Sequence, residues 1–141
     1  MRMTTVLWAL VAALSAGLAQ AQKWDMPTPY NDNEFHTLNV KRFVEDVKNA
    51  SNGQLNIVVH ANGSLIKHPD ILRAVSTGQV NVAEFLLGQF GNEDPVFAAD
   101  NLPFVAAGWE NAWKFYQAQK PLLVKKLQGR GLQLLFSVAW P

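Results

Sequence analysis

Residues 79–85, Gln-Val-Asn-Val-Ala-Glu-Phe, are the most informative segment of this chain. Their apolar run predicts a buried strand with Glu84 at its C-terminal end. In an open α/β sheet, ligands bind outside the carboxyl ends of the strands. A carboxylate buried there costs free energy unless it is paired or hydrogen-bonded. Glu84 is therefore either a ligand-binding residue or an acid held by an internal partner, such as the N-terminus of a neighbouring helix.

The rest of the chain alternates between predicted strands and helices. Further strands are expected at 23–26, 55–59 and 131–139. The Ile-Val-Val run at 57–59 is apolar on successive residues, as in a parallel strand that helices cover on both faces. Short connections between alternating elements favour right-handed βαβ crossovers. The sequence predicts an α/β domain with a mainly parallel sheet flanked by helices.

The first predicted helix has the clearest signals. Asn31 and Glu34 have the spacing of a capping box, and Gly53 is suited to end the helix. An apolar stripe runs between these ends, at Val40, Phe43, Val44 and Val47. Three more helices are expected: one that begins near Pro69, one over 110–117, and one that Pro121 starts and Gly129 ends, with Leu122, Leu123 and Leu127 facing the core. Between them, residues 88–100 predict a loop with a short helical turn.

The N-terminus predicts a signal peptide over residues 1–21. A positive start is followed by an uncharged apolar stretch from Val6 to Leu18 and then by Ala19-Gln20-Ala21. This order is typical of an export signal cleaved after Ala21. An uncleaved membrane anchor is the alternative, but the apolar stretch is shorter than the roughly 20 residues that a spanning helix needs. The mature domain is then 22–141, in the periplasm.

Composition excludes several classes of function. Without Arg2, the chain carries 11 basic and 11 acidic residues, and this balance argues against binding nucleic acid. The chain has no cysteine, which excludes thiol nucleophiles and thiolate metal sites. Nucleophile-elbow, zinc-protease and phosphate-loop motifs are missing too. We expect no catalytic residue, no metal and no cofactor.

Several polar or aromatic residues are expected at the edge of the sheet where Glu84 stands. Tyr30 and Asn31 follow the first strand, His68 precedes a helix, and Trp140 ends the last predicted strand. For Tyr30 the alternative is simple packing against a helix start. His36 opens a helix, where an exposed or capping role is expected. Trp24, Trp109 and Trp113 are expected to serve packing.

Two other readings stay open. Glu84 with His60 or His68 would make an acid/base pair in a secreted α/β hydrolytic enzyme, provided that the side chains lie within hydrogen-bonding distance. A surface interaction domain would instead have a filled sheet edge and a large apolar patch elsewhere.

Seven segments together resemble the N-terminal part of the extracytoplasmic solute-binding subunit of TRAP transporters, the DctP-like family. The resemblance covers essentially the whole mature chain. The segments are Trp24-Asp25-Met26-Pro27-x-Pro29-Tyr30, Ser51-Asn52-Gly53-Gln54-Leu55-x-Ile57, Gly63-Ser64-Leu65 with Lys67, Ala74-Val75-x-x-Gly78, Ala83-Glu84, Asp100-x-Leu102-Pro103-Phe104 and Ala139-Trp140-Pro141.

The resemblance implies a two-lobed periplasmic protein that closes over an organic acid, such as a dicarboxylate, and delivers it to a TRAP membrane permease driven by an ion gradient. This chain would supply the first lobe. Because it stops at the end of a predicted strand, we expect a truncated chain that lacks the second lobe. In such proteins an arginine of the second lobe grips the ligand carboxylate. Arg42, Arg73 and Arg130 lie on helix surfaces or ends and do not match it.

The resemblance also implies site residues. Glu84 matches an acid that contacts the ligand directly or through water, and Tyr30 and Asn31 match the loop that lines the cleft. His68 borders the cleft, and Trp140 matches an aromatic of the cleft wall. Sialic-acid-type members carry an arginine in the segment of Trp140, and its absence argues for another substrate.

Overall fold

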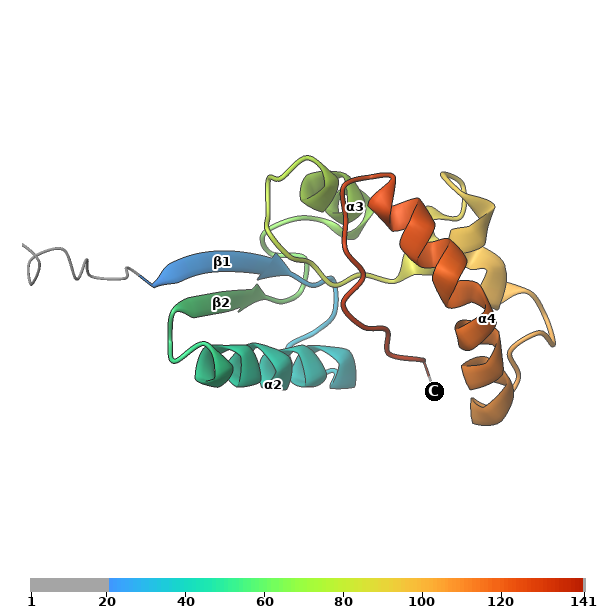
Figure 1. Ribbon diagram of the computed structural model, residues 1–141, viewed down its shortest axis with the longest axis horizontal. Coiled ribbons are helices and arrows are strands. Elements are labelled where there is room, and N and C mark those ends of the chain that lie inside the picture. The colour runs from blue at the N-terminus through green and yellow to red at the C-terminus, as the bar shows by residue number, and fades with distance from the viewer. Residues whose placement is uncertain (1–20, 141) are drawn as a thin grey trace, which may run out of the picture.

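A computed structural model describes residues 21–140, and the chain forms a two-stranded parallel sheet packed against helices (Figure 1). Strand β1 spans Gln22–Pro27 and strand β2 spans Leu55–His60. Trp24 pairs with Ile57 and Pro27 with His60. Helix α2, Phe35–Ala50, connects the strands. The α/β class and both of these predicted strands are confirmed.

The remaining elements follow β2. Helix α3 spans His68–Ser76, two 3₁₀ helices span Leu87–Phe90 (η1) and Pro95–Asn101 (η2), and helix α4 spans Trp109–Gln128. In the view of Figure 1, α2 lies below the strands and α3 above them, while α4 stands apart beyond the carboxyl ends of the strands. Among residues 21–140, no helix combines the length and apolar character needed to cross a membrane. The predicted signal peptide falls, apart from Ala21, outside the described residues.

Two apolar clusters form the core. The first joins the sheet to α2 through Met26, Val40, Ile57 and Val82. The predicted stripe of α2 takes part in it, because Phe43, Val44 and Val47 pack against these residues. The second cluster joins α3, the 3₁₀ helices and α4 through Leu72, Phe90, Phe97, Leu123 and Leu127. The first cluster holds the strands, and the second holds the chain that follows them.

Helix α2 begins later than predicted. The predicted cap, Asn31, only accepts a hydrogen bond from the Glu34 backbone N–H through its backbone oxygen. Glu34 is the N-cap, and its carboxylate accepts the backbone N–H of His36 at 3.1 Å. A carboxylate suits this position because it meets the positive end of the helix dipole.

The predicted break before Pro121 is also wrong, because α4 runs through it as one helix of 20 residues. Pro121 removes one backbone hydrogen bond and crowds the preceding turn, which costs stability but does not end this helix. Leu123 and Leu127 face the core as expected, but Leu122 is exposed.

The predicted strand at 79–85 does not form, although its apolar side chains Val80 and Val82 are buried. One hydrogen bond links the segment to β1, from the Glu84 backbone N–H to the Pro27 oxygen at 3.1 Å. Pro27 and Pro29 have no N–H, so this end of β1 offers few donors for a ladder. The segment is held beside β1 by this one backbone bond and by the burial of its side chains, without a ladder.

The predicted strand at 131–139 does not form either. Among the described residues, no backbone–backbone hydrogen bond involves 133–140. Leu132 and Leu134 pack on the second cluster, and Phe136 meets the ring of Phe43 at 5.1 Å. In Figure 1 this last segment descends between the strands and α4. In the part of the chain that the structure describes, this segment pairs with no strand and is placed by its side chains.

Two phenylalanines test the second cluster. Phe97 is 1% exposed, whereas Phe104 is 96% exposed on the loop before α4. We expect Phe97→Ala to lower the free energy of unfolding by about 3–5 kcal/mol because it leaves a cavity. The control, Phe104→Ala, is expected to change it by less than about 0.5 kcal/mol. Urea titration followed by circular dichroism measures both, and equal losses would contradict the assignment of the core.

Candidate binding site at the carboxyl ends of the strands

The site is built where the 79–85 segment crosses the end of β1. Thr28 follows β1 directly and is fully buried. Its hydroxyl donates to Glu84 Oε2 at 2.6 Å, across 56 positions of sequence. Together with the bond from the Glu84 backbone to Pro27, this contact fixes the carboxylate at the carboxyl ends of the strands. Thr28 was not predicted as a site residue, although a hydroxyl between two prolines at a strand end was a usable signal.

Glu84 has no strong cationic partner among the described residues. Its side chain is 16% exposed, and the one ionisable nitrogen within ion-pair range is His36 Nδ1, 3.9 Å from Oε1. Burial raises the pKa of Glu84, the Thr28 hydrogen bond lowers it, and the charge of Glu34 raises it further. Burial also lowers the pKa of His36, so the imidazole is neutral near pH 7. The site therefore presents a hydrogen-bond acceptor that lacks a compensating charge.

Aromatic rings gather beside this carboxylate. Tyr30 stacks on His36 with ring centroids 5.0 Å apart, and Trp140 lies 5.5 Å from Tyr30 and 4.7 Å from His36. Phe35 adds a ring 3.9 Å from His36. Burial, aided by the charge of Glu84, raises the pKa of Tyr30 to about 12. Its hydroxyl thus remains a proton donor at any physiological pH.

His36 is the important residue that the sequence analysis placed wrongly. It was expected to be exposed or to cap a helix, but it is 3% exposed and lies between these rings. Its position four residues before Val40 extends the buried stripe of α2, which was the signal available in the sequence.

His68 also borders the cluster. Its ring lies 6.4 Å from that of Tyr30, and its Nε2 accepts the Leu86 backbone N–H at 3.2 Å. Burial lowers the pKa of His68, so the ring is neutral near pH 7. The structure thus groups Glu84, Tyr30, His68 and Trp140. Asn31 lies on the same loop as Tyr30 and is exposed.

The acid/base pair of a hydrolytic enzyme finds no support. His60 Nε2 lies 2.8 Å from Asp25 Oδ1, so its partner is on the sheet. No hydrogen bond joins His60 or His68 to Glu84 in the described part of the chain. Residues 21–140 also contain no group of three or more metal-binding side chains.

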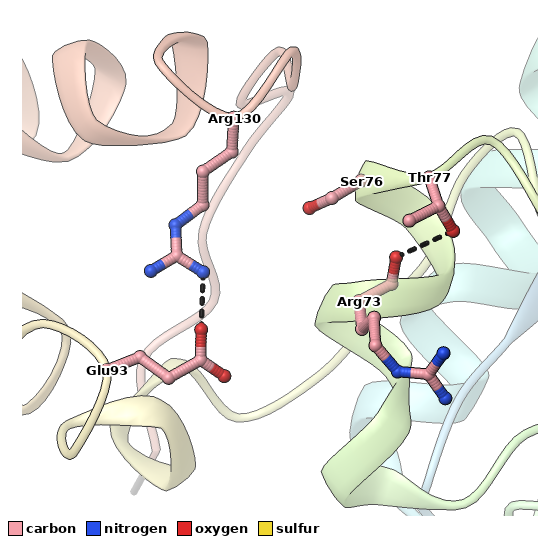
Figure 2. A pocket seen from close by; sticks show the side chains of 5 residues that line it. All are labelled: Arg73, Ser76, Thr77, Glu93 and Arg130. Carbon is pink, nitrogen blue, oxygen red and sulfur yellow. Dashed lines mark hydrogen bonds and ion pairs between the residues drawn. The ribbon is translucent and has the colours of Figure 1, made fainter.

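Of two surface hollows, the larger is not lined by Glu84 or by the aromatic cluster. Figure 2 shows this depression of about 390 Å³, lined by Arg73, Ser76, Thr77, Glu93 and Arg130. Both arginines are engaged, Arg130 with Glu93 and Arg73 with Asp70 at 3.0 Å. A smaller hollow of about 210 Å³ lies beside Trp140, between it and the start of α4. Only the smaller one adjoins the aromatic cluster.

Comparison with known proteins identifies the class to which this geometry belongs. The family "Bacterial extracellular solute-binding protein, family 7" (DctP) matches residues 28–140. The chain belongs to this family of solute-binding receptors. The comparison with curated proteins found no match.

Solved structures agree with this assignment. The extracytoplasmic solute receptor DctP6 of Bordetella pertussis, described as binding pyroglutamic acid, is 51% identical over 85% of this chain, with a TM-score of 0.84. A marine metagenome TRAP solute-binding protein specific for pyroglutamate is 38% identical over 86% of the chain, also with a TM-score of 0.84. DctP7 of Bordetella pertussis, again described as binding pyroglutamic acid, is 36% identical over 82%, with a TM-score of 0.80. The chain spans 40% of DctP6, 40% of the metagenome protein and 38% of DctP7.

The uncompensated charge of Glu84 predicts that Glu84→Gln stabilises the domain. Glutamine can still accept the Thr28 hydrogen bond, and removal of the buried charge should raise the free energy of unfolding by about 1–2 kcal/mol at about pH 7. The folded pKa of Glu84 is raised above 4.5, so its stabilising contribution is present below that pH and is lost as pH rises through the folded pKa. The gain from glutamine should therefore shrink towards about pH 4.

Urea unfolding at both pH values measures this difference. Glu45→Gln, on the exposed face of α2, is the control and should change stability by less than about 0.5 kcal/mol at either pH. A Glu84→Gln variant less stable than the wild type at about pH 7 would show that the carboxylate is compensated after all.

Proposed function

We propose that this chain captures an organic acid in the periplasm for delivery to a TRAP-type membrane permease. The observation that carries the proposal is the 51% identity to DctP6, a receptor described as binding pyroglutamic acid. We infer that residues 1–21 are a signal peptide cleaved after Ala21 and that residues 22–141 are the first lobe of a two-lobed receptor. The ligand class is a carboxylic acid, with pyroglutamate as the first candidate.

The chemistry of the site supports capture rather than reaction. Glu84, the acceptor without a charged partner, is suited to receive an N–H or O–H of the ligand. The Tyr30 hydroxyl is suited to donate, and the Tyr30 and Trp140 rings offer apolar walls. His68 and Asn31 border the same space. No step of covalent chemistry is assigned to these residues, and we propose that the protein is not an enzyme.

The ligand carboxylate needs a different anchor. Glu84 would repel it, and no arginine of the described residues lies in ion-pair range of Glu84. We propose that an arginine of a second lobe supplies this contact. Exposed apolar side chains on the loop after η2 and at the start of α4 are suited to be covered by that lobe: Leu102, Phe104, Val105, Trp109 and Trp113.

Calorimetry on the full-length receptor tests the proposal. We expect pyroglutamate to bind with a dissociation constant on the order of 1 μM or tighter. Glu84→Ala should weaken binding at least about tenfold, because one charge-assisted hydrogen bond is lost. Glu45→Ala is the matched control and should bind like the wild type. No binding of pyroglutamate or of any acid in a panel of mono- and dicarboxylates would overturn the proposed function.

A further inference from the structure

The His36 imidazole has two nitrogens in very different surroundings. Nε2 is fully buried and has no hydrogen-bond partner among the described residues. Nδ1 lies 3.9 Å from Glu84 Oε1, too far for a hydrogen bond but close enough to feel its charge. Burying an N–H without a partner is costly, while an N–H that points towards a carboxylate is favourable. Both effects place the proton of the neutral ring on Nδ1.

Glu84 Oε1 and His36 Nδ1 then form an acceptor and a donor that do not satisfy each other. Thr28 donates to the other oxygen, Oε2, which leaves Oε1 available. Glu34 bonds the His36 backbone and not its ring. An acceptor and a donor 3.9 Å apart can each make one hydrogen bond to a flat group that carries an N–H and a C=O side by side. A cis amide, which carries its N–H and C=O on the same edge, is such a group.

Binding of a ring beside Glu84 and His36 requires the Trp140 indole to move. This indole is 49% exposed, packs 4.7 Å from His36 and borders the hollow of about 210 Å³ beside α4. Its segment, 133–140, makes no backbone–backbone hydrogen bond among the described residues. A shift of the indole towards the hollow would therefore break no backbone–backbone hydrogen bond of the described residues.

We propose that Glu84 and His36 recognise the lactam edge of the ligand, with Glu84 Oε1 accepting the ring N–H and His36 Nδ1–H donating to the ring carbonyl. This inference rests on the proposed function and deepens it. It assigns His36 as a specificity residue and narrows the ligand class to acids whose ring contains a cis amide. Acids that lack this edge leave both groups unpaired and should bind worse.

Calorimetry on the full-length receptor tests the role of His36 with two probes. Pyroglutamate carries the lactam edge, and cyclopentanecarboxylate has the same ring and carboxylate without it. The wild type should prefer pyroglutamate about 100-fold, about tenfold for each hydrogen bond. His36→Phe should reduce this preference about tenfold. His36→Asn, whose amide N–H₂ takes the place of Nδ1, should restore most of it.

The outcomes separate the two proposals. If the wild type binds pyroglutamate and His36→Phe keeps the full preference, the inference is overturned and the proposed function stands. If the wild type binds neither probe nor any other carboxylate, both fall. Long-range ¹H–¹⁵N spectra of the histidine rings give a test independent of the variants. The Nδ1–H tautomer is expected for His36, and an Nε2–H tautomer would overturn the inference.

Discussion

The hydrogen bond between the Thr28 hydroxyl and Glu84 is the contact on which the site depends. It joins the end of β1 to a segment 56 positions later, and a single backbone bond from Glu84 to Pro27 supports it. Because the 79–85 segment forms no ladder with β1, these two bonds and the burial of Val80 and Val82 place the carboxylate. The aromatic cluster around His36 assembles at the same point.

Two buried groups at this site lower the stability of the folded protein. A carboxylate that is mostly buried, without a cation in the described part of the chain, opposes folding at neutral pH. The same holds for an imidazole whose buried nitrogen has no partner. Proteins retain such unpaired groups where a ligand completes them, at some loss of stability. These unpaired groups support the proposal that the site binds the polar edge of a ligand, with the carboxylate anchor supplied by a second lobe.

The sequence predicted the α/β class, both strands that form and the α2 stripe, since these follow from local periodicity. The sequence also predicted that Glu84, Tyr30, His68 and Trp140 lie at the same edge of the sheet. The predictions of strands at 79–85 and 131–139 were wrong, because an apolar run indicates only that a segment is buried. A strand also needs a neighbouring strand with free N–H groups to form a ladder. Pro27 and Pro29 remove such donors. The burial of His36 could have been predicted from the α2 stripe, but its position beside Glu84, like the contact of Thr28 with Glu84, joins distant segments, which periodicity does not encode.

The central claim is that ligand binds at the carboxyl ends of β1 and β2 and not in the larger arginine-lined hollow. Titration of pyroglutamate into the ¹⁵N-labelled full-length receptor, followed by ¹H–¹⁵N spectra, tests it most directly. Among residues 21–140, the largest shifts are expected at the backbone amides of Thr28, Tyr30, His36 and Glu84. Shifts concentrated at Arg73, Ser76 and Arg130, with the Glu84 region unchanged, would contradict it.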